Sequence, residues 1–165
     1  MPGRPDDDPP AVPTRREDVL PAGARHCFAC GDDNPIGMHL NDIRREGDEV
    51  HATLHPRPEY QSYPGVLHGG LAATALDEVM GYAAILLARV WAATATMEVR
   101  FRARVPYDAP LPLVAGVTDA RGRRVRAWAR LHLPDGRVGA EASGLLVALP
   151  AEVAERARAL YGPMA

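Results

Sequence analysis

Residues 69–89 form the one long apolar segment of this chain, and no proline interrupts it. With successive side chains placed about 100° apart, as on a helix, one side of the segment is apolar throughout. That side holds Ala72, Ala75, Leu76, Val79, Ala83 and Leu86. The opposite side is mostly small and holds Gly70, Ala73, Thr74, Asp77, Gly81, Ala84 and Ala88. A helix that is apolar or small on nearly every side is typical of a buried position, so we predict one long buried helix.

Strands are predicted on both sides of this helix. Two strand-like runs lie between His39 and His55, with the hairpin signal Gly47-Asp48 between them. After the helix, residues 94–105 alternate between apolar and polar, and further strand-like runs span residues 110–120, 125–133 and 138–149. The polar face of the first of these runs carries Thr94, Thr96, Glu98, Arg100, Arg102 and Arg104.

A helix that is apolar all round needs a sheet wrapped about it. Two strands, one helix and four strands therefore predict an α+β hotdog fold, in which an antiparallel sheet of about six strands wraps around one long central helix. The open side of such a sheet is expected to close by pairing with a second subunit.

The composition indicates one globular domain in a chain of 165 residues, of which 47% are hydrophobic. We expect a disordered, proline-rich tail over residues 1–18, the hotdog domain over 19–150 and a short C-terminal helix or tail over 151–165. A net charge of -2 argues against a nucleic-acid partner. No apolar run is long enough to predict a membrane span, and no signal pattern opens the chain, so we expect a cytoplasmic protein.

Cys27 and Cys30 form a single Cys-x-x-Cys pair, which could be half of a zinc site or a redox motif. A second such pair does not occur, and His26 and His39 lack the spacing of zinc ligands. We therefore expect no metal, and interpret the cysteines as reduced, mostly buried thiols in a tight loop.

The start of the predicted helix carries the first candidate for chemistry, His68-Gly69-Gly70. Backbone N–H groups at a helix N-terminus suit a carbonyl oxygen that becomes negative under attack. An equally simple interpretation is that the two glycines only permit a tight turn into the helix. His68 could bind substrate or orient the N–H donors, and a helix-capping role fits as well.

Asp77 lies two turns further on, in a stripe of small residues that would leave room for a slender ligand. Thr74 in this stripe and Gly69 at the helix start are candidates for substrate binding. A buried carboxylate without a partner is costly, and no basic residue stands at helical spacing to pair with it. Asp77 is therefore a candidate nucleophile or general base, with a solvent-facing aspartate as the alternative. The neighbouring Glu78 points about 100° away and is expected to be structural or interfacial.

Polar residues of the following strand are candidates for substrate binding. The hydroxyl of Thr94 or of Thr96 could position water or the acyl group. Arg100, Arg102 and Arg104, with arginines further along the chain, could receive phosphate groups. A solvated strand face is the alternative meaning of these charges.

The pattern Pro64-Gly65-Val66-Leu67-His68-Gly69-Gly70, followed by Asp77 and Gly81, resembles the hotdog thioesterases of the phenylacetate-degradation, PaaI-like type. The lead-in CFACGDDNPIGMHL over residues 27–40 is similar too, and the resemblance spans roughly residues 26–149. It implies hydrolysis of acyl-CoA thioesters by a homodimer or dimer of dimers (a homotetramer), with sites at the subunit interface.

The resemblance also assigns roles. It implies that Asp77 is the nucleophile or general base, that the Gly70 N–H is the oxyanion donor and that Thr94 supports catalysis. A helix-to-strand stretch one residue longer than in some relatives leaves Thr96 as the alternative. No metal or cofactor is implied, and coenzyme A enters as part of the substrate.

Other functions fit the same pattern. A non-catalytic acyl-CoA-binding sensor would keep the pocket but would not need Asp77, and a thioesterase could act on acyl-carrier protein instead of coenzyme A. Hotdog hydratases usually carry a histidine a few residues after the acid, and none follows Asp77 in the predicted helix.

Overall fold

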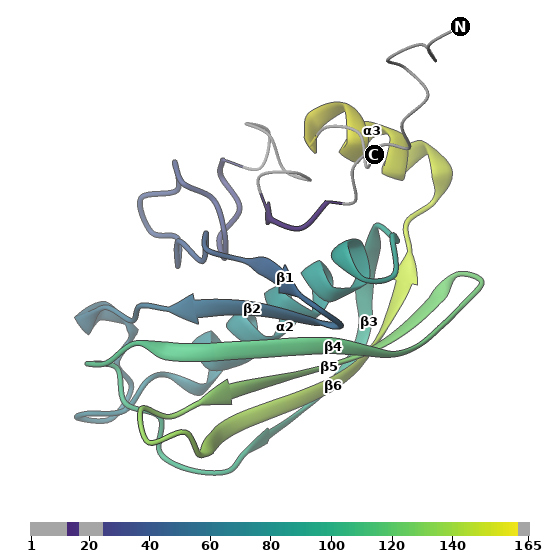
Figure 1. The fold of residues 1–165 in the computed structure, drawn as a ribbon. Coiled ribbons are helices and arrows are strands. Elements are labelled where there is room, and N and C mark those ends of the chain that lie inside the picture. The colour runs from purple at the N-terminus through teal and green to yellow at the C-terminus, as the bar shows by residue number, and fades with distance from the viewer. Residues whose placement is uncertain (1–12, 17–24, 162–165) are drawn as a thin grey trace, which may run out of the picture.

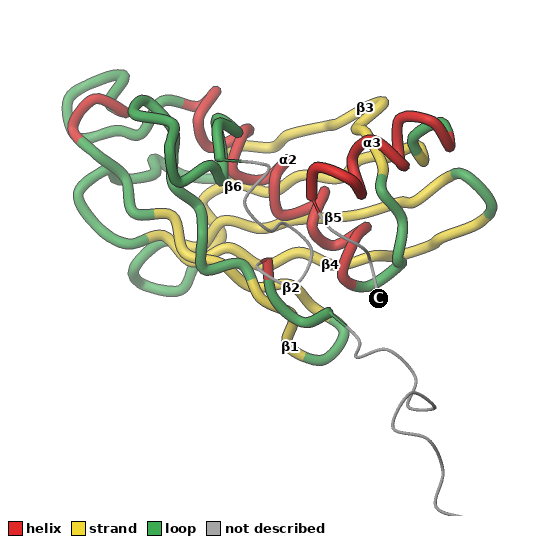
Figure 2. The backbone as a smooth tube through the Cα atoms, turned by 90° about the horizontal axis from the view of Figure 1, so that it is seen from above, coloured by secondary structure: helices red, strands yellow, loops and turns green. Residues whose placement is uncertain are grey.

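A computed structural model describes residues 13–16 and 25–161. Its sheet is antiparallel and six-stranded, with the strand order β1-β2-β4-β5-β6-β3. The strands curve around helix α2, which lies against one face of the sheet (Figure 1, Figure 2). The bounds of the elements are β1 Arg44–Glu46, β2 Glu49–Leu54, η1 Pro58–Tyr60, α2 Gly69–Leu86, β3 Ala92–Phe101, β4 Leu111–Arg121, β5 Arg124–His132, β6 Val138–Ala148 and α3 Ala151–Tyr161. The predicted hotdog arrangement is confirmed.

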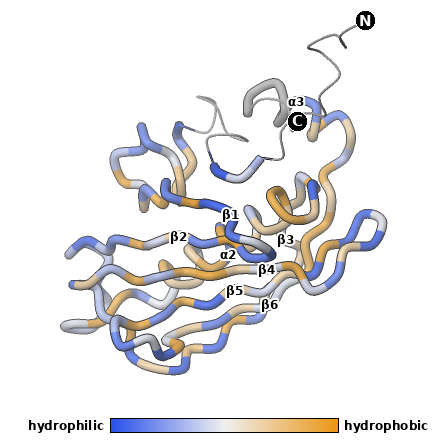
Figure 3. The backbone as a smooth tube through the Cα atoms, in the orientation of Figure 1, coloured by the Kyte–Doolittle hydropathy of each residue, from blue (hydrophilic) through white to orange (hydrophobic). Residues whose placement is uncertain are grey.

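The core lies between α2 and the inner face of the sheet. Every residue predicted for the apolar side of the helix is buried there. The sheet contributes a second set of fully buried aliphatic side chains, and apolar residues follow α2 and the central strands (Figure 3). Burial of each such leucine contributes about 1.5–3 kcal/mol. The sheet side of this core includes Leu54, Leu111, Leu113, Leu131 and Leu146.

The other side of α2 remains partly open. Ala73, Thr74, Asp77 and Gly81 are all partly exposed, and a Cβ built on Gly81 meets nothing within 4 Å. The expectation that the helix is buried on nearly every side therefore does not hold within one chain. An open stripe of small residues runs along the helix and includes Asp77.

Strand β3 forms one edge of the sheet and differs from the predicted alternation. A bulge between Thr94 and Thr96 shifts the register, so that Thr94 pairs with Leu146 and Thr96 with Leu145. Because a bulge inserts one extra residue, it reverses the side on which later side chains point. Thr94 thus faces α2 and Thr96 the outer face of the sheet, and the prediction of one shared polar face is wrong.

Other predicted features lie at the edges of the domain. The strand expected to reach residue 105 ends at Phe101. The expected turns contain Gly47 and Gly136, whose positive φ values of 62° and 84° favour glycine. Of the expected N-terminal tail, Arg15 bridges to Arg44 of β1, while residues 1–12 and 17–24 lie outside the described residues. None of the helices that the structure describes combines the length and apolar character needed to cross a membrane.

Candidate active site

Helix α2 begins with a cap made by His68. The backbone of His68 is extended (φ -62°, ψ 128°), and its side chain accepts a hydrogen bond from the Gly70 N–H, with 3.0 Å between Gly70 N and Nδ1. The His68 carbonyl accepts from Leu71 and Ala72 at 3.0 and 3.1 Å. A neutral imidazole that accepts at Nδ1 carries its proton on Nε2, so the exposed ring presents an N–H to solvent.

This cap engages one of the predicted oxyanion donors. The Gly70 N–H, expected to be free for a ligand, has an acceptor within its own chain. The start of the helix also lies close to Phe101 of β3, because a Cβ on Gly69 would lie 3.3 Å from its Cζ. Phe101 is 56% exposed, which makes it an apolar wall beside the helix N-terminus. Strand alternation predicted an apolar face for Phe101, but no sequence signal places it at His68-Gly69-Gly70.

Asp77 is held by a side chain of the edge strand. The hydroxyl of Thr94 donates to Asp77 Oδ1, and the two oxygens are 2.6 Å apart. This distance is typical of a hydroxyl bound to an ionised carboxylate. Among the described residues, no ion pair involves Asp77. The carboxylate is therefore oriented by a hydroxyl, and no cation neutralises it.

The structure separates the other candidate hydroxyls. Thr96 lies on the outer face, where it lines a hollow with Thr118 and Arg126. Thr74 stands on the same side of α2 as Asp77, but its hydroxyl donates to the Gly70 carbonyl at 2.9 Å. Its oxygen therefore contributes mainly to the helix backbone.

Glu78 occupies a different environment, as its helical spacing predicts. Its Oε1 lies 3.9 Å from the thiol of Cys27, and the hydroxyl of Tyr82 donates to the nearby Cys30 sulfur at 3.5 Å. Burial, followed by the charge of Cys27, raises the pKa of Glu78 to about 7. Glu78 is thus turned away from the stripe of Asp77 and towards the two cysteines.

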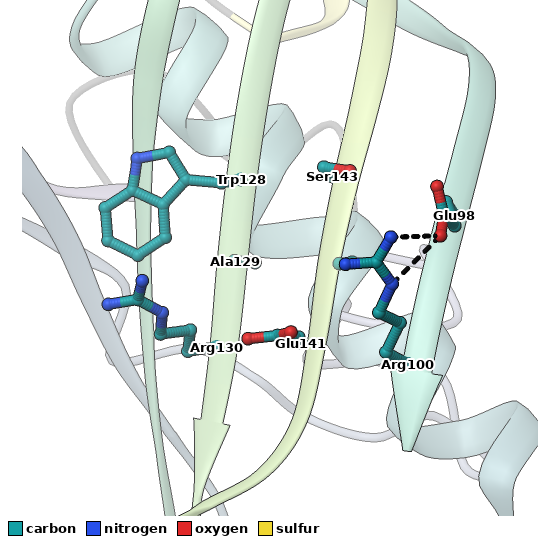
Figure 4. Close-up of a pocket in the computed structure, with 8 residues that line it drawn as sticks. Glu98, Arg100, Trp128, Ala129, Arg130, Glu141 and Ser143 are labelled. Atoms are coloured by element: carbon teal, nitrogen blue, oxygen red, sulfur yellow. Dashed lines mark hydrogen bonds and ion pairs between the residues drawn. The ribbon is translucent and has the colours of Figure 1, made fainter. Parts of the chain in front are cut away.

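The predicted phosphate-binding arginines do not gather beside Asp77. Figure 4 shows Arg100 on the outer face of the sheet, where it pairs with Glu98 at 2.8 Å. Arg102 pairs with Glu141. Arg104 follows the end of β3, is exposed and makes no hydrogen bond or ion pair within the described part of the chain. Among the three arginines of this run, Arg104 is the one whose charge is available to a ligand.

The distance between Gly70 and Asp77 along the helix determines whether both can act on one substrate within a single chain. Gly70 and Asp77 lie about two helical turns apart, which corresponds to roughly 10 Å along the axis. A carbonyl under attack must place its oxygen about 3 Å from the donor and its carbon about 3–3.5 Å from the attacking atom. The two groups of one chain are therefore too far apart to act on the same carbonyl.

Comparison with known proteins agrees with this architecture. The sequence profile of the thioesterase superfamily matches residues 64–140. A solved thioesterase superfamily protein, RHA08564, is 27% identical, with a TM-score of 0.69 over 84% of this chain and 68% of its own. Thioesterase HI1161 from Haemophilus influenzae is 14% identical, with a TM-score of 0.59 over 66% and 77% of the two chains. No curated protein sequence matches this chain.

A third similar structure is a hypothetical thioesterase from Streptococcus pneumoniae, solved with coenzyme A. It is 18% identical, with a TM-score of 0.61 over 66% of this chain and 84% of its own. The same protein has been solved with an aspartate, and separately with a threonine, replaced by alanine. The sequence match over residues 64–140 and the fold together confirm, at the level of the superfamily, the resemblance to hotdog thioesterases that the pattern in residues 64–81 indicates.

Proposed function

We propose that this protein is an acyl-CoA thioesterase, which uses water to split a thioester into a free acid and coenzyme A. The observation that carries the proposal is the carboxylate of Asp77, held by Thr94 at 2.6 Å on the open stripe of α2. No cation among the described residues pairs with Asp77, so its charge is available for chemistry. The superfamily match supports the reaction class.

Asp77 can act in either of two ways. As a nucleophile it attacks the thioester carbonyl, expels the coenzyme A thiolate and forms an anhydride that water then hydrolyses. As a general base it takes a proton from a water molecule that attacks the carbonyl directly. In both cases the Thr94 hydroxyl fixes Oδ1, which leaves Oδ2 for the reacting atom.

The oxyanion of the reaction is assigned to the N-terminus of α2. The Gly70 N–H becomes its donor once the His68 ring turns away, at the cost of one neutral hydrogen bond, about 0.5–1.5 kcal/mol. The helix dipole adds to the stabilisation of negative charge at this end. Gly69 lies beside the same position, and the rotated His68 ring is left to bind another part of the substrate.

The separation of Gly70 from Asp77 supports a site shared between two chains. The N-terminus of α2 in one chain and Asp77 in its partner would meet if the two helices lay antiparallel across their open stripes. Edge strand β3 spans Ala92–Phe101 and offers a free row of backbone groups beside that stripe. We therefore propose a homodimer formed along β3 and α2, with a dimer of dimers as the larger assembly.

The substrate assignment rests on charge and on similarity. The pneumococcal structure contains coenzyme A, whose phosphates require cationic partners. Of the predicted arginines, Arg104 is exposed and available, whereas Arg100 and Arg102 must exchange their carboxylate partners to bind phosphate. The pneumococcal aspartate and threonine variants alter the two residue types that meet here as Asp77 and Thr94.

The direct test is thiol release from short, medium, long and aryl acyl-CoAs by the wild type and by Asp77→Asn. Hydrolysis that is lost in the variant supports the proposal and ranks the acyl groups. Binding of acyl-CoA without hydrolysis would favour a sensor, and turnover of acyl-carrier protein alone would change the carrier. Sedimentation equilibrium of the same preparation measures the assembly, and a monomer with full activity would overturn the shared site.

A further inference from the structure

A second group of reactive side chains lies away from the stripe of Asp77. It consists of the thiols of Cys27 and Cys30 and the carboxylate of Glu78. One ligand atom from each of the three residues lies within 4.8 Å of the other two, and Cys27 Sγ is 3.9 Å from Glu78 Oε1. The proposed hydrolysis uses none of these groups, so the cluster needs a separate explanation.

A tight turn contains the two cysteines. The Gly31 N–H donates to the Cys27 carbonyl at 3.0 Å. A Cβ on Gly31 would lie 2.6 Å from that carbonyl oxygen, so the turn requires glycine at this position. The turn therefore fixes the position of Cys27 relative to Cys30, and the thiolate forms of both side chains can bind a metal ion.

The charges around the cluster favour a cation. The buried side chain of Arg16 donates to the Cys30 carbonyl at 2.7 Å and pairs with Asp32 at 3.1 Å. Its single charge is already shared with Asp32. It therefore cannot by itself balance the two thiolates and the carboxylate that metal binding would bring together. Anions gathered out of water are costly unless they are compensated. A divalent ion would leave one negative charge on the cluster, beside Arg16.

The geometry fits an ion of the zinc class. Zinc binds thiolate sulfur at about 2.3 Å and carboxylate oxygen at about 2.0–2.2 Å in a tetrahedron, whose sulfur–oxygen edges are then roughly 3.5 Å. The distance of 3.9 Å between Cys27 Sγ and Glu78 Oε1 is close to such an edge. Two soft sulfurs with one oxygen also favour zinc over magnesium or calcium.

We propose that Cys27, Cys30 and Glu78 bind one Zn²⁺-like divalent cation, with a water molecule as the fourth ligand. Binding displaces the two thiol protons to solvent. The Tyr82 hydroxyl, which donates to the Cys30 sulfur at 3.5 Å, serves as an outer partner. The ion would fasten the loop over residues 25–40 to α2 at the residue next to Asp77. The lone Cys-x-x-Cys pair cannot indicate this site, because its third ligand lies 51 residues beyond Cys27.

The test is a titration of the reduced, metal-free full chain with Co²⁺, followed by Zn²⁺. Thiolate ligands give bound cobalt a near-ultraviolet charge-transfer band, so we expect this band to saturate at one Co²⁺ per chain and to disappear on addition of Zn²⁺. Cys27→Ser should abolish the band, and Glu78→Gln should weaken binding about tenfold or more. Asp33→Asn is the matched control, because this exposed carboxylate of the same loop pairs with Arg25 outside the cluster and its loss should change nothing.

Two outcomes would overturn the proposal. One is a wild type that binds no cobalt although far-ultraviolet circular dichroism shows it to be folded. The other is binding that survives both Cys27→Ser and Glu78→Gln. The protein could also be purified with a Cys27–Cys30 disulfide. If it then binds no cobalt after reduction, the metal site is overturned and the two cysteines are a redox pair. None of these measurements uses hydrolysis, so the result is independent of the thioesterase test.

Discussion

Asp77 and Glu78 are adjacent carboxylates on one helix, yet their surroundings have little in common. Asp77 faces an open stripe of small residues, accepts one short hydrogen bond from Thr94 and is partly exposed. Glu78 faces the thiols of Cys27 and Cys30, and burial raises its pKa to about 7. The helical offset of about 100° between neighbours gives the two carboxylates separate environments. The environment, more than the residue type, determines which carboxylate can react and which can bind a metal.

The largest expected effect separates these two carboxylates directly. Asp77→Asn keeps the size of the side chain but removes its charge, so it should lower kcat by about 100-fold or more. Glu78→Gln should lower kcat by less than about tenfold, because Glu78 acts on the reaction only through the position of α2. Steady-state thiol release by both variants measures the difference. Equal losses would show that the two sides of the helix are not functionally distinct.

A second prediction tests the contact that orients Asp77. Thr94→Val removes the donor to Oδ1 and keeps the shape of the side chain, so it should lower kcat by about tenfold or more. Thr96→Val is the matched control on the outer face and should leave kcat within about twofold. The ratio of the two kcat values is the measurement. A greater loss in Thr96→Val would contradict the register that the bulge imposes.

The two threonines also show how far the sequence can be interpreted. Helical periodicity predicts the buried side of α2, including Leu76 and Val79, and the separation of Asp77 from Glu78. Strand alternation does not reveal which threonine meets Asp77, because it assumes an unbroken period and the bulge breaks it.

Other parts of the site depend on contacts between distant segments. The approach of Cys27 to Glu78 joins residues 51 positions apart, and no local pattern encodes it. The cap on Gly70 depends on the rotamer of His68, which spacing alone does not determine. The sequence therefore predicts the type of site and its main carboxylate, whereas the partners of that carboxylate and of the helix N-terminus come from tertiary structure.

A third prediction concerns substrate binding away from both carboxylates. Arg104→Ala should raise KM for acyl-CoA about three- to tenfold and change kcat little, because its exposed charge has no partner among the described residues. Arg100→Ala should raise KM less, since Glu98 already neutralises Arg100 at 2.8 Å. The measurement is KM for acyl-CoA and for an acyl-pantetheine, which lacks the nucleotide phosphates. The difference between the two isolates the contribution of phosphate binding. An Arg104→Ala variant that loses affinity equally for both substrates would rule out a phosphate contact.

The smallest expected effect tests whether the open stripe beside Asp77 receives the acyl group. Glycine within a helix costs about 0.5–1 kcal/mol relative to alanine, and a Cβ on Gly81 meets nothing within 4 Å in one chain. Gly81→Ala should therefore raise the free energy of unfolding by about 0.5–1 kcal/mol, if the stripe is empty in the folded protein without substrate. The same methyl group should reduce kcat/KM for bulky acyl-CoAs more than for short ones, because it narrows the stripe one turn beyond Asp77. Denaturant unfolding, together with turnover of the acyl-CoA panel, separates the two effects. A more stable variant with unchanged acyl preference would place the acyl group elsewhere, and a destabilised variant would indicate that a second chain already fills the space beside Gly81.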